Sequence, residues 1–429
     1  MDKVYVAVLG LGTIGKGVVK VLQNNADQWV KKCGAEIEIK KALERSQEMV
    51  RQVALPEGVA TDDWKQIIDD PDIKIIIEVL GGIEPARTFI IEALKRGKSV
   101  VTANKDLMAE HGEELFAAAE ESETDLYFEA SVAGGIPIIA VLKQSLAANN
   151  IKKIMGIVNG TTNYILTRMS RAGLSFEAAL AEAKTLGYAE ANPTNDVEGY
   201  DAARKIAILA SIAFHTRVKF QDVHVEGITK ITAEDIAHAA ELGYVIKLLG
   251  ITREDNEQIE VRVHPALVPV EHPLANVNDA FNAVYVHGDA VGETMFYGRG
   301  AGQLPTASAV VGDIIEIAKN LQRNCSGRLL CTCYDNKKIK DFGDVVSKYY
   351  LRMNVIDKPG VLASIASVFG NHGVSLASVI QKDADRKENA ELVVITHKVK
   401  ESDIQDALKV IREMSITIRI DNLIRVEGS

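Results

Sequence analysis

The sequence predicts an α/β protein in three parts: an N-terminal doubly wound parallel sheet, a central α+β region and a small C-terminal ferredoxin-like module. Three observations predict this fold class. Short apolar runs alternate with amphipathic helical patterns up to about residue 129, as in parallel βαβ units. Longer helical patterns follow from residue 130. The last part of the chain then has the strand and helix order βαββαβ.

The composition is that of a globular protein with two or three cores. The chain has 429 residues, of which 47% are hydrophobic and 25% charged. A net charge of -10 argues against a nucleic-acid partner, which needs clustered basic residues, and favours a small-molecule ligand. No stretch has the apolar length of a membrane span, and the first residues lead directly into a strand, so we expect no membrane partner and a cytoplasmic location.

The first part has five candidate strands, at residues 4–9, 37–39, 75–79, 100–101 and 126–128. Helical patterns lie between them. The pattern at residues 85–96 has Pro85 at its start and Gly97 at its end, which are the positions that these two residues favour in helices.

A glycine-rich loop joins the first strand to the first helix. Gly10, Gly12 and Gly15 form a G-x-G-x-x-G pattern directly after the strand. Gly10 permits a tight turn, Gly12 lets backbone amides approach a pyrophosphate, and Gly15 lets the helix pack on the strand. Because the pattern lies between a strand and a helix, it predicts a Rossmann-type site for a dinucleotide.

The end of the second strand bears on the choice of dinucleotide. Glu44 suits a ribose hydroxyl, as in NAD, whereas Arg45 and Ser46 suit the 2′-phosphate of NADP. A solvated turn would give the same run of residues. We favour NADP and keep NAD as the alternative.

The central part begins where the turn Gly134-Gly135-Ile136-Pro137 changes the pattern, and its strands indicate a different, antiparallel-rich sheet. A long apolar helix from Pro305 to about Leu321 is placed back against the first part by analogy with two-domain dehydrogenases. We therefore expect residues 1–129 with 305–323 to form the dinucleotide domain, residues 130–304 the substrate and dimerisation domain, and residues 348–429 the third domain.

The third part has candidate strands at residues 349–355, 374–380, 392–396 and 416–420 and candidate helices at residues 360–369 and 403–414. The chain has four cysteines, and we expect all of them to be ordinary reduced thiols. Cys331 and Cys333, near Cys325, have no histidine or fourth cysteine at zinc-site spacing.

Asp201 and Lys205 are four residues apart and so share one face of a predicted helix. Such a spacing more often marks a surface ion pair. Here Ile208 and Ile212 fall on either side of the direction in which the two charges point, which places the pair on an apolar face. Buried charges are costly unless they are paired or used, so both residues are functional candidates. Lys105 is a further functional candidate. It follows the predicted strand Ser99 to Thr102, and ligands bind at the carboxyl ends of parallel strands.

Taken together, the motifs resemble homoserine dehydrogenase over essentially the whole chain. Besides the glycine loop, the blocks that carry the resemblance are Thr102-Ala103-Asn104-Lys105, Glu129-Ala130-Ser131-Val132-Ala133-Gly134-Gly135-Ile136-Pro137, Asn159-Gly160-Thr161-Thr162-Asn163-Tyr164-Ile165, Leu186-Gly187-Tyr188-Ala189-Glu190, the helix from Asp201 to Lys205, and Gly300-Ala301-Gly302 before Pro305. The family often has another glycine where Gln303 stands.

The resemblance implies NAD(P)-linked interconversion of L-homoserine and L-aspartate 4-semialdehyde, on the branch to threonine and methionine. It implies that Lys205 is the acid/base, that Glu190 and Asp201 hold polar groups of the substrate and that Lys105 reaches the same site. The implied cofactor positions, besides the glycine loop, are Thr13, Ile14, Lys105, Gly187 and Gly302. The implied sodium positions are Glu129, Val132, Gly134 and Ile136. A homodimer or homotetramer is also implied.

Residues 349–429 look like an ACT domain, the small-ligand module of many amino-acid biosynthetic enzymes. The turn Asp357-Lys358-Pro359-Gly360-Val361-Leu362 leads into a helix whose free amides suit a carboxylate. The alternative is a structural or dimerising appendage. With the pathway that the resemblance implies, L-threonine is the expected feedback ligand, and truncation near Gly343 is expected to leave activity but remove inhibition.

Two rival functions are weighed. A ligand sensor without turnover would need none of Lys105, Glu190, Asp201 and Lys205, so their joint presence disfavours it. A different dehydrogenase on the same scaffold would be separated by a panel of substrates.

Overall fold

The computed structural model describes residues 3–383 and 389–428. The chain divides into two compact units. Unit 1 comprises Met1–Ile154, Arg204–Val223 and Asn282–Lys337, and unit 2 comprises Met155–Ala203, His224–Phe281 and Lys338–Ser429. No helix of the described part is long and apolar enough to span a membrane.

A parallel sheet forms the centre of unit 1. Its strand order is β3-β2-β1-β4-β5-β6, and every neighbouring pair is parallel. This is the doubly wound order whose crevice, at the carboxyl ends of the strands, binds ligands. The strands are β1 (Lys3–Leu9), β2 (Glu36–Leu43), β3 (Ala60–Thr61), β4 (Ile73–Glu78), β5 (Ser99–Thr102) and β6 (Leu126–Tyr127).

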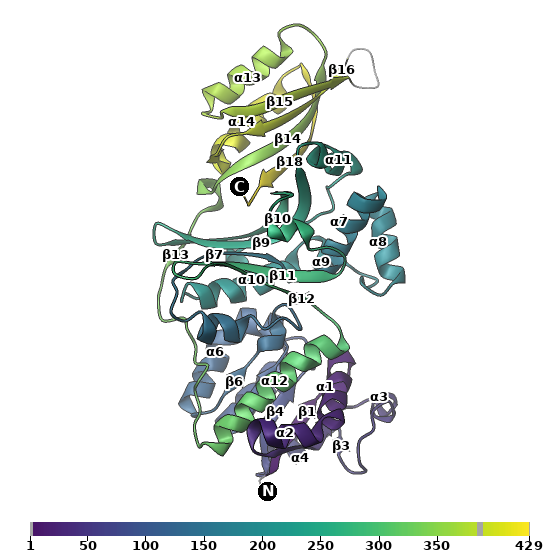
Figure 1. Cartoon of the computed structure of the whole chain (residues 1–429), viewed down its shortest axis with the longest axis vertical. Helices are drawn as coiled ribbons and strands as arrows, with labels where there is room; N and C mark the ends of the chain where they lie inside the picture. The colour runs from purple at the N-terminus through teal and green to yellow at the C-terminus, as the bar shows by residue number, and fades with distance from the viewer. Residues whose placement is uncertain (1–2, 384–388, 429) are drawn as a thin grey trace. The chain divides into compact units, whose positions relative to one another are not determined.

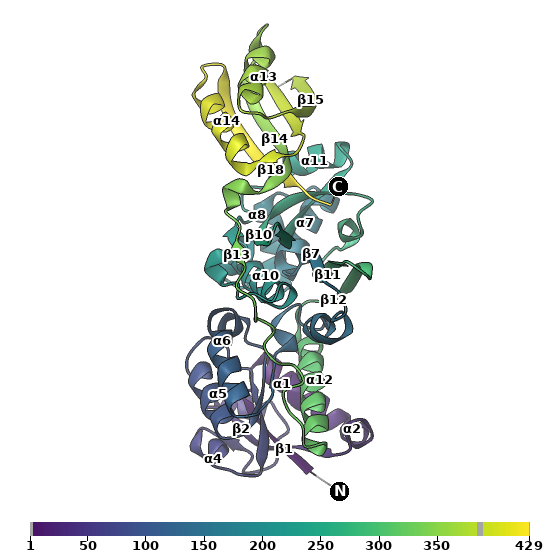
Figure 2. The ribbon, with the colours of Figure 1, turned by 90° about the vertical axis from the view of Figure 1, so that its left-hand side faces the viewer.

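Helices cover this sheet because their apolar faces need burial. They are α1 (Thr13–Asn24), α2 (Ala26–Cys33), α3 (Gln47–Arg51), α4 (Lys65–Ile68), α5 (Ala86–Lys95), α6 (Lys105–Glu121) and α12 (Gln303–Gln322). Figures 1 and 2 show α12 beside α1, far apart in sequence. Val310 and Ile314 of α12 share one core with Val6 and Val8 of β1, in the place that the analogy with two-domain dehydrogenases predicted.

The remaining elements of unit 1 include the 3₁₀ turns η1 (Glu129–Ser131) and η3 (Phe220–Asp222), the π-helical η2 (Val141–Ser145) and the strands β11 (Phe281–Gly288) and β12 (Gly292–Arg299). Strand β7 (Ile151–Ile157) and helix α10 (Tyr200–Ala213) each have residues in both units, as does β11, whose first residue, Phe281, belongs to unit 2.

Unit 2 contains a mixed sheet in the order β9-β10-β18-β14-β16-β15. Its strands are β8 (His224–Val225), β9 (Tyr244–Asp255), β10 (Gln258–Pro269), β13 (Lys338–Ile339), β14 (Val346–Ile356), β15 (Leu376–Asp383), β16 (Asn389–Thr396), β17 (Val399–Lys400) and β18 (Thr417–Val426). Its helices are α7 (Gly160–Ala172), α8 (Phe176–Thr185), α9 (Thr194–Val197), α11 (Ala233–Glu241), α13 (Val361–Asn371) and α14 (Glu401–Glu413), with the short turns η4 (Pro273–Asn276) and η5 (Phe342–Asp344).

The C-terminal βαββαβ order is present as β14, α13, β15, β16, α14 and β18. Helices α13 and α14 lie together against these strands (Figure 1), and their core includes Leu351, Ile365 and Leu408. Strand β18 also pairs in parallel with β10, so the module shares a sheet with the preceding region. The predicted α/β fold class is confirmed.

Candidate active site

The glycine loop of unit 1 has the geometry of a phosphate cradle. Gly10 has a left-handed φ of 96°, and a Cβ on Gly15 would lie 2.0 Å from the Gly10 carbonyl oxygen. A Cβ on Gly12 would meet no atom within 4 Å, so the space beside it is open. Gly12 caps α1 without a side-chain hydrogen bond. The first amides of α1 therefore remain available to an anionic group, which fits the pyrophosphate of a dinucleotide.

Glu44 connects the end of β2 to that loop. Its carboxylate accepts hydrogen bonds from the backbone amides of Leu11 (3.0 Å) and Ser46 (2.9 Å). The Ser46 hydroxyl in turn caps α3 by accepting from the Met49 amide. Arg45, between them, is exposed. The structure thus gives Glu44 a role in fixing the loop, a contact 33 residues away that the local pattern did not contain.

Lys105 is placed by a buried network at the ends of β4 and β5. The Glu78 carboxylate, fully buried, accepts from the Thr102 hydroxyl (2.6 Å) and from the Leu80 amide (2.8 Å). Burial raises the pKa of Glu78. The Thr102 hydroxyl accepts from the Asn104 amide, and the Asn104 side chain caps α6, whose first residue is Lys105. Lys105, a candidate site residue, therefore begins a helix at the carboxyl edge of the sheet, where ligands bind in such folds.

Asp201 is buried near the start of α10, with 7% of its surface exposed, which excludes a surface ion pair. The Asn159 side-chain amide donates to the carboxylates of Asp201 (2.9 Å) and Asp196 (2.7 Å). The other end of the Asn159 side chain accepts from the Thr162 amide and hydroxyl, both at 2.9 Å, and caps α7. Asn159 thus holds Asp201 in a defined position.

Lys205 lies one turn after Asp201 on α10 and is half-buried. The predicted apolar stripe understates the burial, since residues of α10 on every side are covered, including Ala203, Ile206 and Leu209, which have no exposed surface. A helix that is apolar all round belongs in a protein interior. Its few charged residues are therefore specifically placed: the residue before Lys205, Arg204, pairs with Asp106 of α6 at 2.9 Å.

Glu190 lies in an exposed turn after α8. Gly187 takes a left-handed φ of 76° there, and the Tyr188 carbonyl accepts from the Thr161 hydroxyl at 2.6 Å. The turn is thereby attached to α7, the helix that Asn159 caps. Gly302, with φ of 123°, is the N-cap residue of α12.

The loop from Glu129 to Ile136 turns sharply, with left-handed φ values at Ala133 (55°) and Gly134 (52°). The Glu129 carboxylate accepts from the amides of Ile138 (2.6 Å), Ile139 (2.7 Å) and Ala140 (2.7 Å). Burial raises the pKa of Glu129, and the three amides oppose that rise. The Glu129 carboxylate is thus occupied by hydrogen bonds to three backbone amides. A cation at this loop would therefore be bound mainly by backbone carbonyl oxygens, which suit a hard ion.

Comparisons with known proteins agree with this geometry. Residues 137–315 match the homoserine dehydrogenase family, residues 10–129 its NAD binding domain, and residues 349–415 the ACT domain. A homoserine dehydrogenase of Bacillus subtilis is 46% identical over 100% of this chain and 99% of its own length. The chain belongs to the homoserine dehydrogenase family.

Solved structures of homoserine dehydrogenases have the same fold. The enzyme from Thiobacillus denitrificans is 41% identical, with a TM-score of 0.95 over 100% of this chain and 99% of that one. A hyperthermophilic archaeal homoserine dehydrogenase in complex with NADPH is 27% identical, with a TM-score of 0.63 over 73% of this chain and 97% of that one. The predicted NAD(P)-dependent oxidoreductase with an ACT domain is thereby confirmed.

In this homoserine dehydrogenase the residues predicted from the sequence fall in both units. Lys105, Lys205 and the Glu129 loop belong to unit 1, and Glu190 and Asp201 belong to unit 2. Sequence reasoning missed Glu78 and the role of Asn159. Asn159 lies in the Asn-Gly-Thr-Thr-Asn block that carried part of the resemblance, but its partner Asp201 is 42 residues away, so only the fold reveals the contact.

Proposed function

We propose that this enzyme interconverts L-homoserine and L-aspartate 4-semialdehyde, with NADP preferred to NAD, in the biosynthesis of threonine and methionine. The observation that supports this most directly is the buried Asp201, held by Asn159 one turn before Lys205. A carboxylate fixed in this way can bind a cationic or hydroxyl group of a small polar substrate.

Lys205 is the proposed acid/base. In the oxidation of homoserine it accepts the proton of the substrate hydroxyl, and in the reverse direction it returns that proton to the oxygen. Asp201 and Glu190 hold the polar groups of the amino acid, and Lys105, at the N-terminus of α6, assists at the same centre. When bound, the nicotinamide cofactor supplies hydride transfer.

The proposed cofactor positions are those of the glycine loop, Gly10, Gly12, Thr13, Ile14 and Gly15, together with Lys105, Gly187 and Gly302. The preference for NADP rests on Arg45 and Ser46 at the end of β2, where a 2′-phosphate would lie. The exposure of Arg45 leaves it available, whereas Glu44 already holds two backbone amides.

Spectrophotometric oxidation of L-homoserine, with NAD and NADP in parallel, tests reaction and cofactor together. We expect reduction of either nucleotide only when homoserine is added, and a higher kcat/KM with NADP. No turnover of homoserine, together with turnover of another small hydroxy acid in a substrate panel, would refute the proposed substrate. An Arg45→Ala variant should lose the preference for NADP but keep activity with NAD.

We further propose that sodium binds at the loop of Glu129, Val132, Gly134 and Ile136, mainly through backbone carbonyls. The left-handed turn at Ala133 and Gly134 supports this, because it bends the chain within a few residues. Activity measured in sodium and in a bulky organic cation, at constant ionic strength, should be higher in sodium.

The C-terminal module is proposed to bind L-threonine as a feedback inhibitor. A pocket in unit 2 is lined by Asp357, Lys358, Gly360 and Gln381, among others. Gly360 has a left-handed φ of 87° and precedes α13 without a side-chain cap, so the first amides of α13 can receive a carboxylate. The Asp357 carboxylate, which accepts from the Gln381 amide at 3.2 Å, can receive an ammonium group.

The three domains predicted from the sequence, the homodimeric or homotetrameric state and the cytoplasmic location remain part of this proposal. Sedimentation equilibrium of the full chain would measure the number of subunits.

A further inference from the structure

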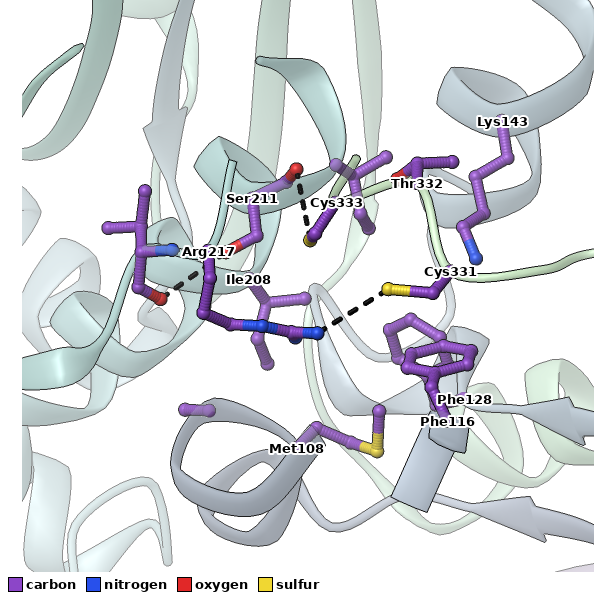
Figure 3. A pocket seen from close by; sticks show the side chains of 13 residues that line it. Met108, Phe116, Phe128, Lys143, Ile208, Ser211, Arg217, Cys331, Thr332 and Cys333 are labelled. Carbon is purple, nitrogen blue, oxygen red and sulfur yellow. Dashed lines mark hydrogen bonds between the residues drawn. The ribbon is translucent and has the colours of Figure 1, made fainter. Parts of the chain in front are cut away.

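A small cavity in unit 1 has a chemistry that the proposed reaction does not use. Helices α6 and α10 form its walls, together with η2 and the segment of residues 331–333 (Figure 3). Met108, Phe116, Phe128 and Ile208 make these walls largely apolar. Cys331 and Cys333 bring two free thiols to the same cavity.

Positive charges surround the sulfur of Cys331. The Arg217 Nη2 atom lies 3.4 Å from Cys331 Sγ and donates a hydrogen bond to it. Arg217 Nε is buried and, among the described residues, has no hydrogen-bond partner. In Figure 3 the Lys143 ammonium reaches toward Cys331 from the side opposite Arg217.

Lys143 also holds the backbone next to this thiol. Its ammonium group donates to the carbonyl oxygens of Leu330 (2.7 Å) and Leu329 (3.3 Å) and lies over the rings of Phe116 and Phe128. Burial lowers the pKa of Lys143 to about 8, which leaves the amine mostly protonated at neutral pH. The segment that carries Cys331 is thus fixed beside a second cation.

Cys333 completes the arrangement. Its thiol donates a hydrogen bond to the Ser211 carbonyl oxygen at 3.7 Å (Figure 3). The neighbouring Cys333 side chain, followed by the Cys333 amide, Arg217 and Lys143, lowers the pKa of Cys331. The neighbouring Cys331 sulfur, followed by burial, raises the pKa of Cys333. One sulfur is therefore favoured as the thiolate, and the other as its proton-bearing neighbour.

We propose that Cys331 is a modification site for small uncharged electrophiles, hydroperoxides above all, and that Cys333 is its resolving thiol. The Cys331 thiolate attacks one oxygen of the hydroperoxide, so that an S–O bond forms and the O–O bond breaks. The leaving oxygen departs as hydroxide or alkoxide and takes a proton from water. Cys333 then attacks the sulfenic sulfur, so that the S–S bond forms, the S–O bond breaks, and water leaves with the Cys333 proton.

The chain contains its own control for this proposal. Cys325 is exposed, whereas Cys331 is half-buried and Cys33 is buried. If exposure alone governed reactivity, Cys325 would react first. If the charges around the sulfur govern it, Cys331 reacts first in spite of its lower exposure.

The test is competitive labelling of the full chain with limiting iodoacetamide at neutral pH, followed by peptide mass spectrometry. We expect Cys331 to be labelled at least about tenfold faster than Cys325, in line with a larger thiolate fraction. An Arg217→Gln variant should reduce that ratio. A ratio of one or below in the unmodified sequence would overturn the proposal.

Hydrogen peroxide tests the second step. The tryptic peptide of residues 329–337, which contains both thiols, should lose two hydrogen atoms as the internal disulfide forms. In Cys333→Ser, dimedone should instead trap a sulfenic acid on Cys331. Cys331→Ser should show neither product and should keep its basal activity. A disulfide that forms equally fast from Cys325, or no product at Cys331 in any variant, would contradict the proposal.

Discussion

The side chains of the proposed site differ in how the chain holds them. Asp201 is fixed by the amide of Asn159, which is itself fixed by Thr162. Lys205 shares the helix of Asp201 but is only half-buried. We take this difference to separate binding from chemistry: Asp201 positions the substrate, and Lys205 moves the proton.

Replacing Lys205 by alanine removes the proposed proton carrier. We expect kcat to fall by about 10²- to 10⁴-fold, the usual contribution of general acid–base catalysis, while the affinity for NADPH is unchanged because the glycine loop is untouched. Steady-state kinetics and nucleotide fluorescence titration measure the two quantities. Lys319→Ala on α12, which also removes one ammonium, is the matched control and should retain full activity. A Lys205→Ala enzyme with near-normal kcat would exclude the proposed role.

Asn159 offers a test of positioning. In Asn159→Ser the side chain can still cap α7, but it loses the hydrogen bonds to Asp201 and Asp196. A hydrogen bond to a charged group contributes about 1.5–3 kcal/mol, so we expect KM for homoserine to rise at least about tenfold, with KM for the nucleotide unchanged. Ser175→Ala removes the cap of α8 instead and should lower thermal stability without changing KM. Loss of stability with an unaltered KM in Asn159→Ser would make Asn159 purely structural.

His264 is expected to make the stability of the folded chain depend on pH. It is fully buried in β10, its Nδ1 donates to the Pro265 carbonyl at 2.8 Å, and its Nε2 has no partner among the described residues. Burial, followed by the charges of Arg425 and Arg262, lowers the pKa of His264 from 6.5 to about 3. Between these values the unfolded chain binds a proton that the folded chain does not, so stability falls as pH drops below 6.5.

The slope contributed by this one group is at most about 1.4 kcal/mol per pH unit. We expect His264→Asn, which can retain the bond to Pro265 but does not titrate, to lack that contribution. Urea unfolding of both proteins at several pH values between about 4 and 7 measures it. Parallel curves for the two proteins would show that His264 does not titrate as described.

At the scale of elements, the glycine loop provides a pair of substitutions that separate folding from binding. A Cβ on Gly15 would lie 2.0 Å from the Gly10 carbonyl oxygen, whereas a Cβ on Gly12 meets nothing within 4 Å. We expect Gly15→Ala to lower the melting temperature. Gly12→Ala should fold normally but raise KM for the nucleotide about tenfold or more, because its methyl group would occupy the proposed pyrophosphate space. Equal effects of both variants on stability would contradict this division.

The sequence predicted the elements whose signals are local. Strands β1 and β4 are runs of mostly buried apolar residues, so pattern and structure agree there, whereas α10 is buried on more sides than its predicted apolar stripe. Strands β3 and β17, of two residues each, were missed. Strand β18 was predicted to end at residue 420 but continues to Val426. Its last residues include the buried Arg425, which looks like a surface residue until Glu401 and Glu226 are seen to pair with it.

The candidate site, like the fold, was predicted only where its signals are local in the sequence. The local pattern identified the glycine loop, Asp201, Lys205 and Lys105, because turns and buried charges leave a local signature. Glu190, Gly187, Gly302 and the sodium positions came only from the family resemblance. The residues that hold them in place did not show in the sequence. Glu78 reads as the polar end of an apolar strand, and its contact with Thr102 crosses 24 residues. Such partners are set by strand order, which the local pattern does not contain.

At the scale of the whole molecule, the C-terminal module is bound to the rest of unit 2 by buried ion pairs. Arg352 pairs with Asp235 at 2.7 Å, and Glu427 pairs with Arg262 at 2.6 Å. Truncation near Gly343 would remove these partners from Asp235 and Arg262, although Arg262 would keep its pair with Glu260 at 2.9 Å. The prediction that the shortened chain keeps its activity and loses inhibition is untested, and a loss of stability on removal of these ion pairs would complicate its reading.

Point variants in the proposed effector pocket are thus the better test of threonine regulation. We expect L-threonine to inhibit the full chain, and Asp357→Asn to weaken that inhibition about tenfold, within the 1–3 kcal/mol typical of coupling between two sites. Asp406→Asn, an exposed carboxylate on α14 outside this pocket, is the matched control and should respond to threonine normally. Because the pocket and Lys205 belong to different units, uninhibited kcat and KM should be unchanged in both variants. If threonine inhibits the Asp357→Asn variant as strongly as the unmodified enzyme, and if threonine competes with homoserine, then threonine acts as a substrate analogue and the C-terminal module has another role.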